Sequence, residues 1–130
     1  MSRILVTGGS GFIGSHTASL FIEKGYDLFI IDSLVNSSAN VLNRLEEIQE
    51  ATHTKNYPKI KFFRGDLRND NFLDECFKSI CEKNDEVDSV IHFAGLKSVN
   101  ESSNDPIRYW DFNLKGTINC IDVLKKFMKN

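Results

Sequence analysis

Four glycines stand within residues 7–16, Thr-Gly-Gly-Ser-Gly-Phe-Ile-Gly-Ser-His, and fit the templates Gly9-x-Gly11-x-x-Gly14 and Gly8-x-x-Gly11-x-x-Gly14. The apolar run before them, Ile4–Val6, is typical of a buried strand. The residues after them have helical spacing up to Lys24, with an apolar set of Phe12, Ile13, Ala18, Leu20, Phe21 and Ile22. Glycines at a strand-to-helix turn let a diphosphate approach the backbone, and N–H groups at the helix start then face it. The segment therefore predicts a dinucleotide-binding turn, and the alternative is a flexible loop.

An acidic residue ends the next predicted strand. Gly25 fits the left-handed stop of the first helix, and Asp27–Ile31 is a nearly apolar strand, as expected in a parallel sheet. Asp32 follows it, 18 positions beyond Gly14. A carboxylate there accepts hydrogen bonds from a ribose 2′-hydroxyl and repels a 2′-phosphate, so we expect NAD in preference to NADP. The alternative is a solvated turn aspartate.

Composition narrows the expected partners. The 130 residues carry 16 basic and 18 acidic side chains, and a net charge of −2 does not favour nucleic acid or a membrane surface. No apolar run reaches 18 residues, and Met1–Arg3 leads directly into a predicted strand, unlike a signal peptide. We expect one domain, in the cytoplasm, whose reduced, buried thiols form no CxxC pair: Cys76, Cys81 and Cys120.

The rest of the chain alternates predicted helices and strands. Ser37 or Ser38 can cap a helix over 39–51, which turns inward Val41, Leu42, Leu45 and Ile48. A strand over 60–63 precedes a helix over 72–83, whose core stripe is Phe72, Leu73, Cys76, Phe77 and Ile80. A strand over 87–93 leads into a loop from Ala94 to Asn104, and Asp105-Pro106 starts a last helix that reaches about Met128.

This order predicts a Rossmann-like, doubly wound parallel α/β sheet of strand order 3-2-1-4, truncated after the fourth βα unit. The loops after Val6, Ile31 and Phe93 should then converge at the carboxyl ends of the strands, where such sheets bind ligands. Asp66, at the end of the third strand, either meets an adenine amino group or is an ordinary turn residue.

Four stretches carry a family resemblance: Thr7–His16, Ile31–Ser37, Gly65–Arg68 and His92–Ser102. Together they resemble the N-terminal, NAD-binding part of UDP-glucose 4-epimerase, in the extended short-chain dehydrogenase/reductase family, over the whole chain. The most specific stretch is His-Phe-Ala-Gly-Leu-Lys at 92–97. Asn100, in place of a glycine, and Ser33, in place of an asparagine, depart from the family pattern.

The resemblance implies a role for individual residues. Backbone N–H groups of Phe12 and Ile13 would bind the diphosphate. The residues around the adenosine ribose would be Asp32, Ser33, Leu34, Val35, Asn36 and Ser37. Asp66 and Leu67 would contact adenine, and the nicotinamide side would be lined by Phe93, Ala94, Gly95, Leu96 and Lys97, with Asn113 beside the same cofactor. From the residues alone, Lys97 is equally a solvated loop lysine and Asn113 a polar helix position.

The resemblance also implies an isomerase of UDP-sugars, with a serine after a fifth strand and a Tyr-x-x-x-Lys helix. There the tyrosine is the base on the sugar 4′-hydroxyl, and NAD takes a hydride from C4′ and returns it to the other face. The chain reaches Asn130 before those elements, so we expect no catalytic residue in it and no activity alone. The alternatives are an NAD-binding module without catalysis, or the cofactor half of a different NAD-dependent sugar-nucleotide epimerase or dehydratase.

Two sets of residues resemble catalytic or metal-binding groups without the required geometry. Tyr57 and Lys61 have the spacing Tyr-x-x-x-Lys, but a proline follows Tyr57 and Lys61 lies in a predicted strand, so they do not share a helix face. The histidines have no metal-pair spacing, so we expect no metal and structural roles for His16, His53 and His92.

The last predicted strand and helix suggest self-association. Ser89–Phe93 would be an apolar edge strand without Lys or Pro. The last helix carries more apolar side chains than one buried face needs: Ile107, Trp110, Phe112, Leu114, Ile118, Ile121, Leu124 and Phe127. In the family this helix helps form a homodimer, and we expect the chain alone to be marginally stable.

Overall fold

The computed structural model describes residues 2–82 and 85–128. The chain divides into two compact units, and each is described by itself. The first unit comprises Met1–Arg64 and Val87–Phe93, and the second comprises Gly65–Glu86 and Ala94–Asn130. The sequence predicted a single domain, and that prediction stays open.

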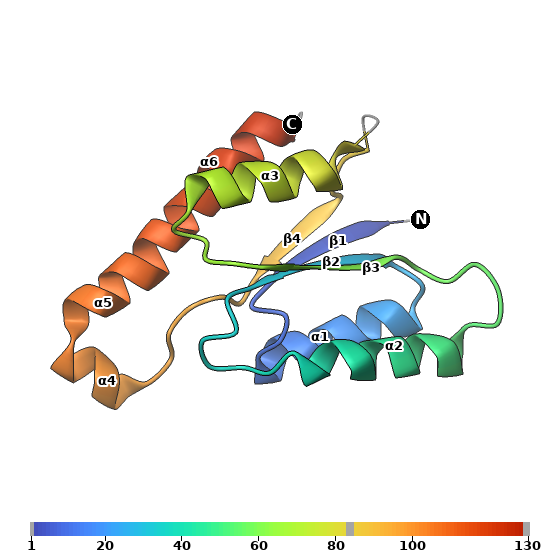
Figure 1. The fold of residues 1–130 in the computed structure, drawn as a ribbon, viewed down its shortest axis with the longest axis horizontal. Coiled ribbons are helices and arrows are strands. Elements are labelled where there is room, and N and C mark those ends of the chain that lie inside the picture. Colours follow the sequence, from blue (N-terminus) through green and yellow to red (C-terminus); the bar gives the residue numbers. More distant parts are fainter. Residues whose placement is uncertain (1, 83–84, 129–130) are drawn as a thin grey trace. The chain divides into compact units, whose positions relative to one another are not determined.

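The first unit is built on one parallel sheet (Figure 1). Its strands are β1 (Arg3–Thr7), β2 (Asp27–Asp32), β3 (Ile60–Arg64) and β4 (Ser89–His92), in the order β3-β2-β1-β4. The predicted order is confirmed. Thr7 at the end of β1 is level with Ile31 of β2 and His92 of β4, so the carboxyl ends of these three strands lie at one edge of the sheet.

Helices α1 (Phe12–Glu23) and α2 (Asn40–Thr52) lie side by side along one face of this sheet (Figure 1). Apolar residues from both helices and from two strands form the core of the unit: Ile4, Val6, Ala18, Ile22, Leu28, Ile30 and Leu45. The predicted inward face of α2 is confirmed, since Val41, Leu42 and Ile48 pack against this core. Gly25, with φ +79°, confirms the left-handed stop after α1.

Half of the apolar set of α1 is exposed. Gly14, Ala18 and Ile22 recur every four residues and are the buried residues of the helix. Phe12, Ile13 and Leu20 project away from that stripe and are exposed, Phe12 to 83%. The helix therefore buries fewer of its apolar side chains than it carries, because the position of a side chain around the helix axis decides its burial.

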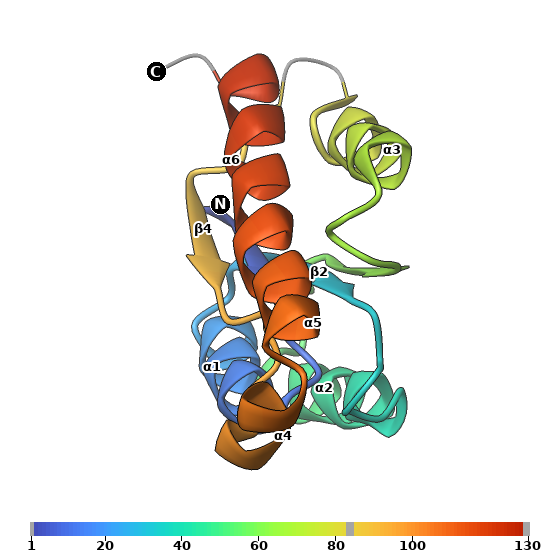
Figure 2. The ribbon, with the colours of Figure 1, turned by 90° about the vertical axis from the view of Figure 1, so that its left-hand side faces the viewer.

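The second unit contains helices (Figure 2). They are α3 (Asp70–Ile80), α4 (Val99–Asn104), α5 (Pro106–Trp110), the π-helical turn η2 (Asp111–Lys115) and α6 (Gly116–Phe127). Figure 2 shows α5 and α6 as one continuous rod, with α4 at its foot. α3 packs against α6 through the rings of Phe77 and Phe127, 5.9 Å apart, and through an ion pair of Asp74 with Lys126 at 2.6 Å.

Two predictions about residues 94–128 are wrong. The loop expected through Asn104 ends in α4, because Ser98 caps that helix by accepting a hydrogen bond from Glu101 N–H at 3.2 Å. The single helix expected after Asp105 is interrupted by η2, where the backbone widens to π-helical bonding. The predicted cap at Asp105 is confirmed, since its carboxylate accepts a hydrogen bond from Arg108 N–H at 3.2 Å.

Other bounds differ by a few residues. β4 begins at Ser89 instead of residue 87 and ends at His92, one residue before the predicted end. α3 begins at Asp70 because the Asn69 side chain accepts the Phe72 N–H at 3.1 Å, and four of its predicted core residues are buried: Leu73, Cys76, Phe77 and Ile80. The predicted end of this helix, Lys83, falls outside the described residues. No helix in the described ranges is long and apolar enough to cross a membrane.

Candidate functional site

The glycine-rich turn joins β1 to α1, and its glycines have separate physical tasks. Gly8 adopts φ +70°, a conformation that a side chain disfavours, while its N–H donates to Ile31 O at 2.8 Å. Gly14 lies against the turn itself, because a Cβ on it would stand 2.1 Å from Gly8 O. These two glycines therefore let the helix begin directly beside the end of the sheet.

Gly11 is the glycine of this turn that leaves room for a ligand. Among the described residues, a Cβ on Gly11 would meet only Gly8 O, at 3.3 Å. Gly11 is also the N-cap of α1, and within the described residues no side chain caps it and no acid lies in the first turn. The first N–H groups of a helix, here those of Phe12 and Ile13, have no carbonyl partner inside the helix. The helix start therefore combines free backbone donors, the positive end of the dipole and open space, which suits an anion.

Asp32 is buried, with 7% of its surface exposed, so the alternative of a solvated turn aspartate is wrong. Its Oδ2 accepts a hydrogen bond from Ser10 N–H at 2.9 Å, and its Oδ1 accepts from Leu34 N–H at 2.8 Å and from the Ser37 hydroxyl at 3.3 Å. A carboxylate offers about four acceptor positions, so one remains for a ribose hydroxyl. The sequence gives no signal that pairs Ser10 with Asp32, because the two residues are 22 positions apart.

The segment after Asp32 is held in a special conformation. Leu34 adopts φ +59°, which costs a residue with a side chain about 1–2 kcal/mol. The bond from Leu34 N–H to the Asp32 carboxylate holds this turn in place. Val35 and Asn36 are exposed and Ser33 is half-buried, so the predicted ribose-side residues line an accessible turn.

Phe93 continues the line of β4 at the same edge of the sheet. Its N–H donates to Thr7 O at 3.0 Å, and one residue earlier His92 Nδ1 lies 2.6 Å from the buried Thr7 hydroxyl. Of the residues predicted for the site, the first unit thus brings together at this edge the glycine turn, the turn after Asp32, and Phe93.

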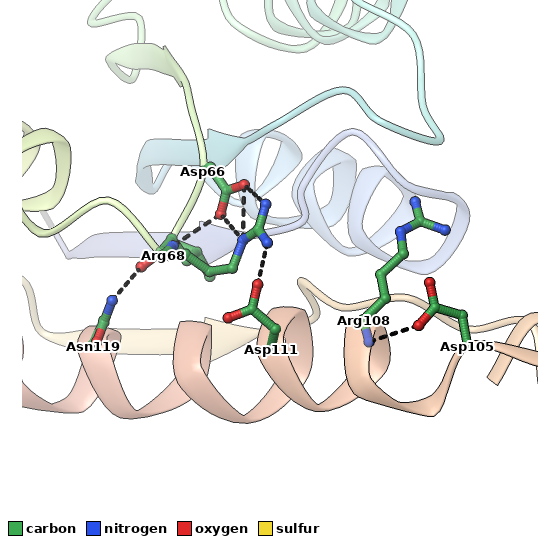
Figure 3. Close-up of polar contacts among 7 residues, drawn as sticks. Asp66, Arg68, Asp105, Arg108, Asp111 and Asn119 are labelled. Atoms are coloured by element: carbon green, nitrogen blue, oxygen red, sulfur yellow. Dashed lines mark hydrogen bonds and ion pairs between the residues drawn. The ribbon is translucent and has the colours of Figure 1, made fainter.

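The second unit holds Asp66 and Leu67 beside η2 and α6 (Figure 3). The Arg68 guanidinium donates a hydrogen bond to the Asp66 carboxylate and also forms an ion pair with Asp111. Leu67 is buried, and Asn119 donates a hydrogen bond from Nδ2 to its carbonyl at 3.2 Å. Hydrogen bonds from the Arg68 side chain hold the pKa of Asp66 below its usual range, and Asp66 in turn raises the pKa of Arg68. Sequence reasoning missed Arg68, because its partner Asp111 lies on a distant helix.

Asn113 joins the segment after β4 to η2. Its Oδ1 accepts from Leu96 N–H at 2.7 Å and its Nδ2 donates to Leu96 O at 3.0 Å, so both ends of the amide bind one buried residue. A Cβ on Gly95 would stand 3.0 Å from that Oδ1 and 3.2 Å from Lys97 Nζ. The cofactor contacts expected of Ala94, Gly95, Leu96, Lys97 and Asn113 stay predictions.

His16 and His53 contact the backbone, and Tyr57 and Lys61 do not share a helix face. His16 and His53 bond backbone carbonyls of Phe12 and Ile22 at 2.7 and 2.6 Å. Tyr57 is exposed before β3, and Lys61 lies within that strand. Within residues 2–82 and 85–128, no group of three His, Cys, Asp or Glu side chains is placed to hold a metal ion.

Comparisons with known proteins relate this chain to a family. Residues 5–130 match the family described as GDP-mannose 4,6 dehydratase. The UDP-glucose 4-epimerase of Schizosaccharomyces pombe is 42% identical over 124 residues, 95% of this chain and 32% of that protein. The bifunctional UDP-glucose 4-epimerase and UDP-xylose 4-epimerase 1 of Pisum sativum is 43% identical over 124 residues, 95% of this chain and 33% of that protein.

A solved structure shows the same fold. The crystal structure of UDP-glucose 4-epimerase from Bifidobacterium longum, in complex with NAD+ and UDP, has a TM-score of 0.82 and 40% identity. The match covers 97% of this chain and 34% of that one. The predicted Rossmann-like fold class is confirmed, and the chain spans about a third of the length of the curated relatives it matches.

Proposed function

This chain belongs to the GDP-mannose 4,6 dehydratase family, and from that premise we propose that residues 1–130 are the NAD-binding domain of a UDP-glucose 4-epimerase. The observation that carries the proposal is the uncapped start of α1, open above Gly11, tied through Ser10 to the buried Asp32. The Bifidobacterium longum relative, 40% identical, was crystallised with NAD+ and UDP.

The residues fit the two polar parts of NAD that this unit would hold. The N–H groups of Phe12 and Ile13 and the helix dipole favour the diphosphate. The remaining acceptor position of Asp32 favours a ribose hydroxyl, and its charge disfavours the 2′-phosphate of NADP. In the second unit we assign Asp66 and Leu67 to adenine, and Gly95, Lys97 and their neighbours to the nicotinamide side.

NAD would supply a reversible acceptor for the hydride at C4 of a UDP-sugar. Residues of this chain would bind and orient the cofactor, and we assign none of them a catalytic role. The Pisum sativum relative is named for both UDP-glucose and UDP-xylose, so we propose a UDP-sugar substrate for the whole enzyme.

We also propose a homodimer and a cytoplasmic location. One side of the rod formed by α5, η2 and α6 exposes a stripe of large apolar side chains: Ile107, Trp110, Leu114, Ile118 and Ile121. Such a stripe favours a second copy of the chain. Cys76 and Cys120 are buried, and burial raises the pKa of the Cys120 thiol, so reduced cysteines in a reducing compartment fit the structure.

Calorimetric titration of the chain with NAD and with NADP tests the proposal. We expect NAD to bind at least tenfold more tightly than NADP, and Gly11→Val to abolish binding of both by filling the space above the helix start. Tyr57→Phe is a matched control outside the proposed site, and we expect it to bind both cofactors as the unchanged chain does. No binding of NAD to the folded chain, or equal binding of NADP, would contradict the proposal.

A further inference from the structure

Arg68 provides every hydrogen bond that the structure records on the Asp66 carboxylate within the described residues (Figure 3). Its backbone N–H donates to Oδ1 at 2.9 Å, and its Nε–H is shared between Oδ1 and Oδ2, at 3.1 Å from each. Its Nη2 donates to Oδ2 at 2.6 Å. The bidentate geometry fixes the plane of the carboxylate, which a single lysine ammonium would not do.

The guanidinium is itself held from η2. Nη1 pairs with the Asp111 carboxylate, and Cζ lies over the Phe112 ring, 3.5 Å from its centroid. The backbone beside Arg68 is also fixed, since Asn119 donates a hydrogen bond to Leu67 O at 3.2 Å. Arg68 therefore fixes the position of the Asp66 carboxylate relative to η2.

This arrangement leaves the Asp66 carboxylate able to accept a further hydrogen bond. Three donors of Arg68 make four contacts with the carboxylate, two on each oxygen, and one donor, Nε–H, is divided between the two oxygens at 3.1 Å. Three donors do not saturate a carboxylate that can accept about four, so it can still accept one more. The side chain of Asp66 is one-third exposed, so the remaining position is accessible. An ionised carboxylate with one free acceptor position suits a donor such as the exocyclic amino group of adenine and opposes a carbonyl oxygen in the same place.

We propose that Arg68 is a positioning residue that holds the Asp66 carboxylate for the amino group of adenine, and so makes the cofactor site select adenine over an oxygen-substituted base. This inference rests on the proposed function, because it assumes that the bound ligand is a dinucleotide. Asp66 touches the base, and Arg68 acts through Asp66. Asp111 and Phe112 stabilise the guanidinium in that position.

The test compares NAD with nicotinamide hypoxanthine dinucleotide, which has a carbonyl where adenine has its amino group. For the unchanged chain we expect NAD to bind at least tenfold more tightly, in line with a hydrogen bond to a charged group. In Arg68→Met this ratio should fall below threefold. The affinity for the hypoxanthine cofactor should stay within threefold of its value in the unchanged chain. Arg68→Lys should give an intermediate ratio, and it serves as the test if Arg68→Met does not fold by circular dichroism.

Arg108→Met is the matched control. Arg108 lies over the same Phe112 ring, 5.5 Å from its centroid, and pairs with Glu101 at 3.7 Å, but its guanidinium points away from Asp66 (Figure 3). We expect Arg108→Met to keep the ratio of the unchanged chain. The difference between the two arginine variants separates positioning of Asp66 from general loss of a guanidinium beside the Phe112 ring.

Distinct outcomes overturn the inference and the proposed function. If the folded, unchanged chain binds neither cofactor, the proposed function fails and the inference fails with it. If the chain binds NAD but does not discriminate against hypoxanthine, or if Arg68→Met keeps the discrimination, only the inference fails. If Arg68→Met loses affinity for both cofactors equally, Arg68 has a merely structural role, and the inference is also overturned.

Discussion

Asp32 accepts a hydrogen bond from the backbone N–H of Ser10 at 2.9 Å, and this contact ties the end of β2 to the glycine-rich turn after β1. The same carboxylate holds Leu34 in its left-handed conformation. A residue that would select the ribose therefore also shapes the turn that would bind the diphosphate. Selectivity and stability are coupled at this one side chain.

Asp32→Ala should destabilise the chain as well as narrow the preference for NAD over NADP. The change leaves the N–H groups of the buried Ser10 and the half-buried Leu34 without their acceptor, and such a loss costs about 1–3 kcal/mol where the group is buried. We expect the free energy of unfolding to fall by about 3 kcal/mol in urea denaturation. Ser37→Ala, which removes only the 3.3 Å bond to Asp32, should cost less than about 1 kcal/mol. Equal losses for the two variants would contradict the coupling.

Gly14→Ala and Gly11→Ala should separate stability from binding. The new Cβ at position 14 would stand 2.1 Å from Gly8 O, a backbone atom, so we expect a loss of about 2 kcal/mol or more in unfolding free energy. At position 11 the nearest contact is 3.3 Å, so stability should change by less than about 1 kcal/mol, while affinity for NAD falls at least tenfold. Urea denaturation and calorimetry measure the two effects. A Gly14→Ala variant as stable as the unchanged chain would contradict the close approach of Gly14 to Gly8 O.

The Asp66–Arg68 pair should make the stability of the fold decrease at low pH. Arg68 holds the pKa of folded Asp66 below its ordinary value of 3.8, so the folded chain binds fewer protons there than the unfolded chain. The resulting stabilisation is present above pH 3.8 and is lost as the pH falls through the lower pKa of the folded state. Urea midpoints should therefore fall less steeply below pH 4 in Arg68→Met than in the unchanged chain. Arg108→Met should keep the original slope, and equal slopes in all three proteins would contradict the assignment.

The apolar stripe on α5, η2 and α6 should mediate self-association. Ile118→Glu places a charge in the stripe, so we expect the sedimentation coefficient at tens of micromolar to shift toward that of the monomer. Lys125→Gln is the control, because it changes the net charge by the same single unit at an exposed position of α6. If the unchanged chain is already a monomer at this concentration, the stripe does not join copies of this chain.

Local patterns in the sequence determined most of the backbone. The glycine spacing, the apolar runs at 4–6 and 27–31, and the cap at Asp105 predicted strands, turns and helix starts, because each depends on residues within one or two turns of chain. The sheet order followed from the connections between those elements. α4 is also encoded locally, in Ser98-x-x-Glu101, a capping-box pattern.

Tertiary structure decided the contacts between residues far apart in the chain. Ser10 and Asp32 are 22 positions apart, and Arg68 and Asp111 are 43 apart, so no local pattern pairs them. The exposure of Phe12 and Ile13 and the π-helical turn that presents Asp111 and Asn113 depend likewise on what each helix packs against. The sequence by itself thus determined the fold class and the residues available for a dinucleotide. Only the folded chain decided which carboxylates are buried, which donors hold them and which acceptor positions stay open, because these depend on three-dimensional proximity.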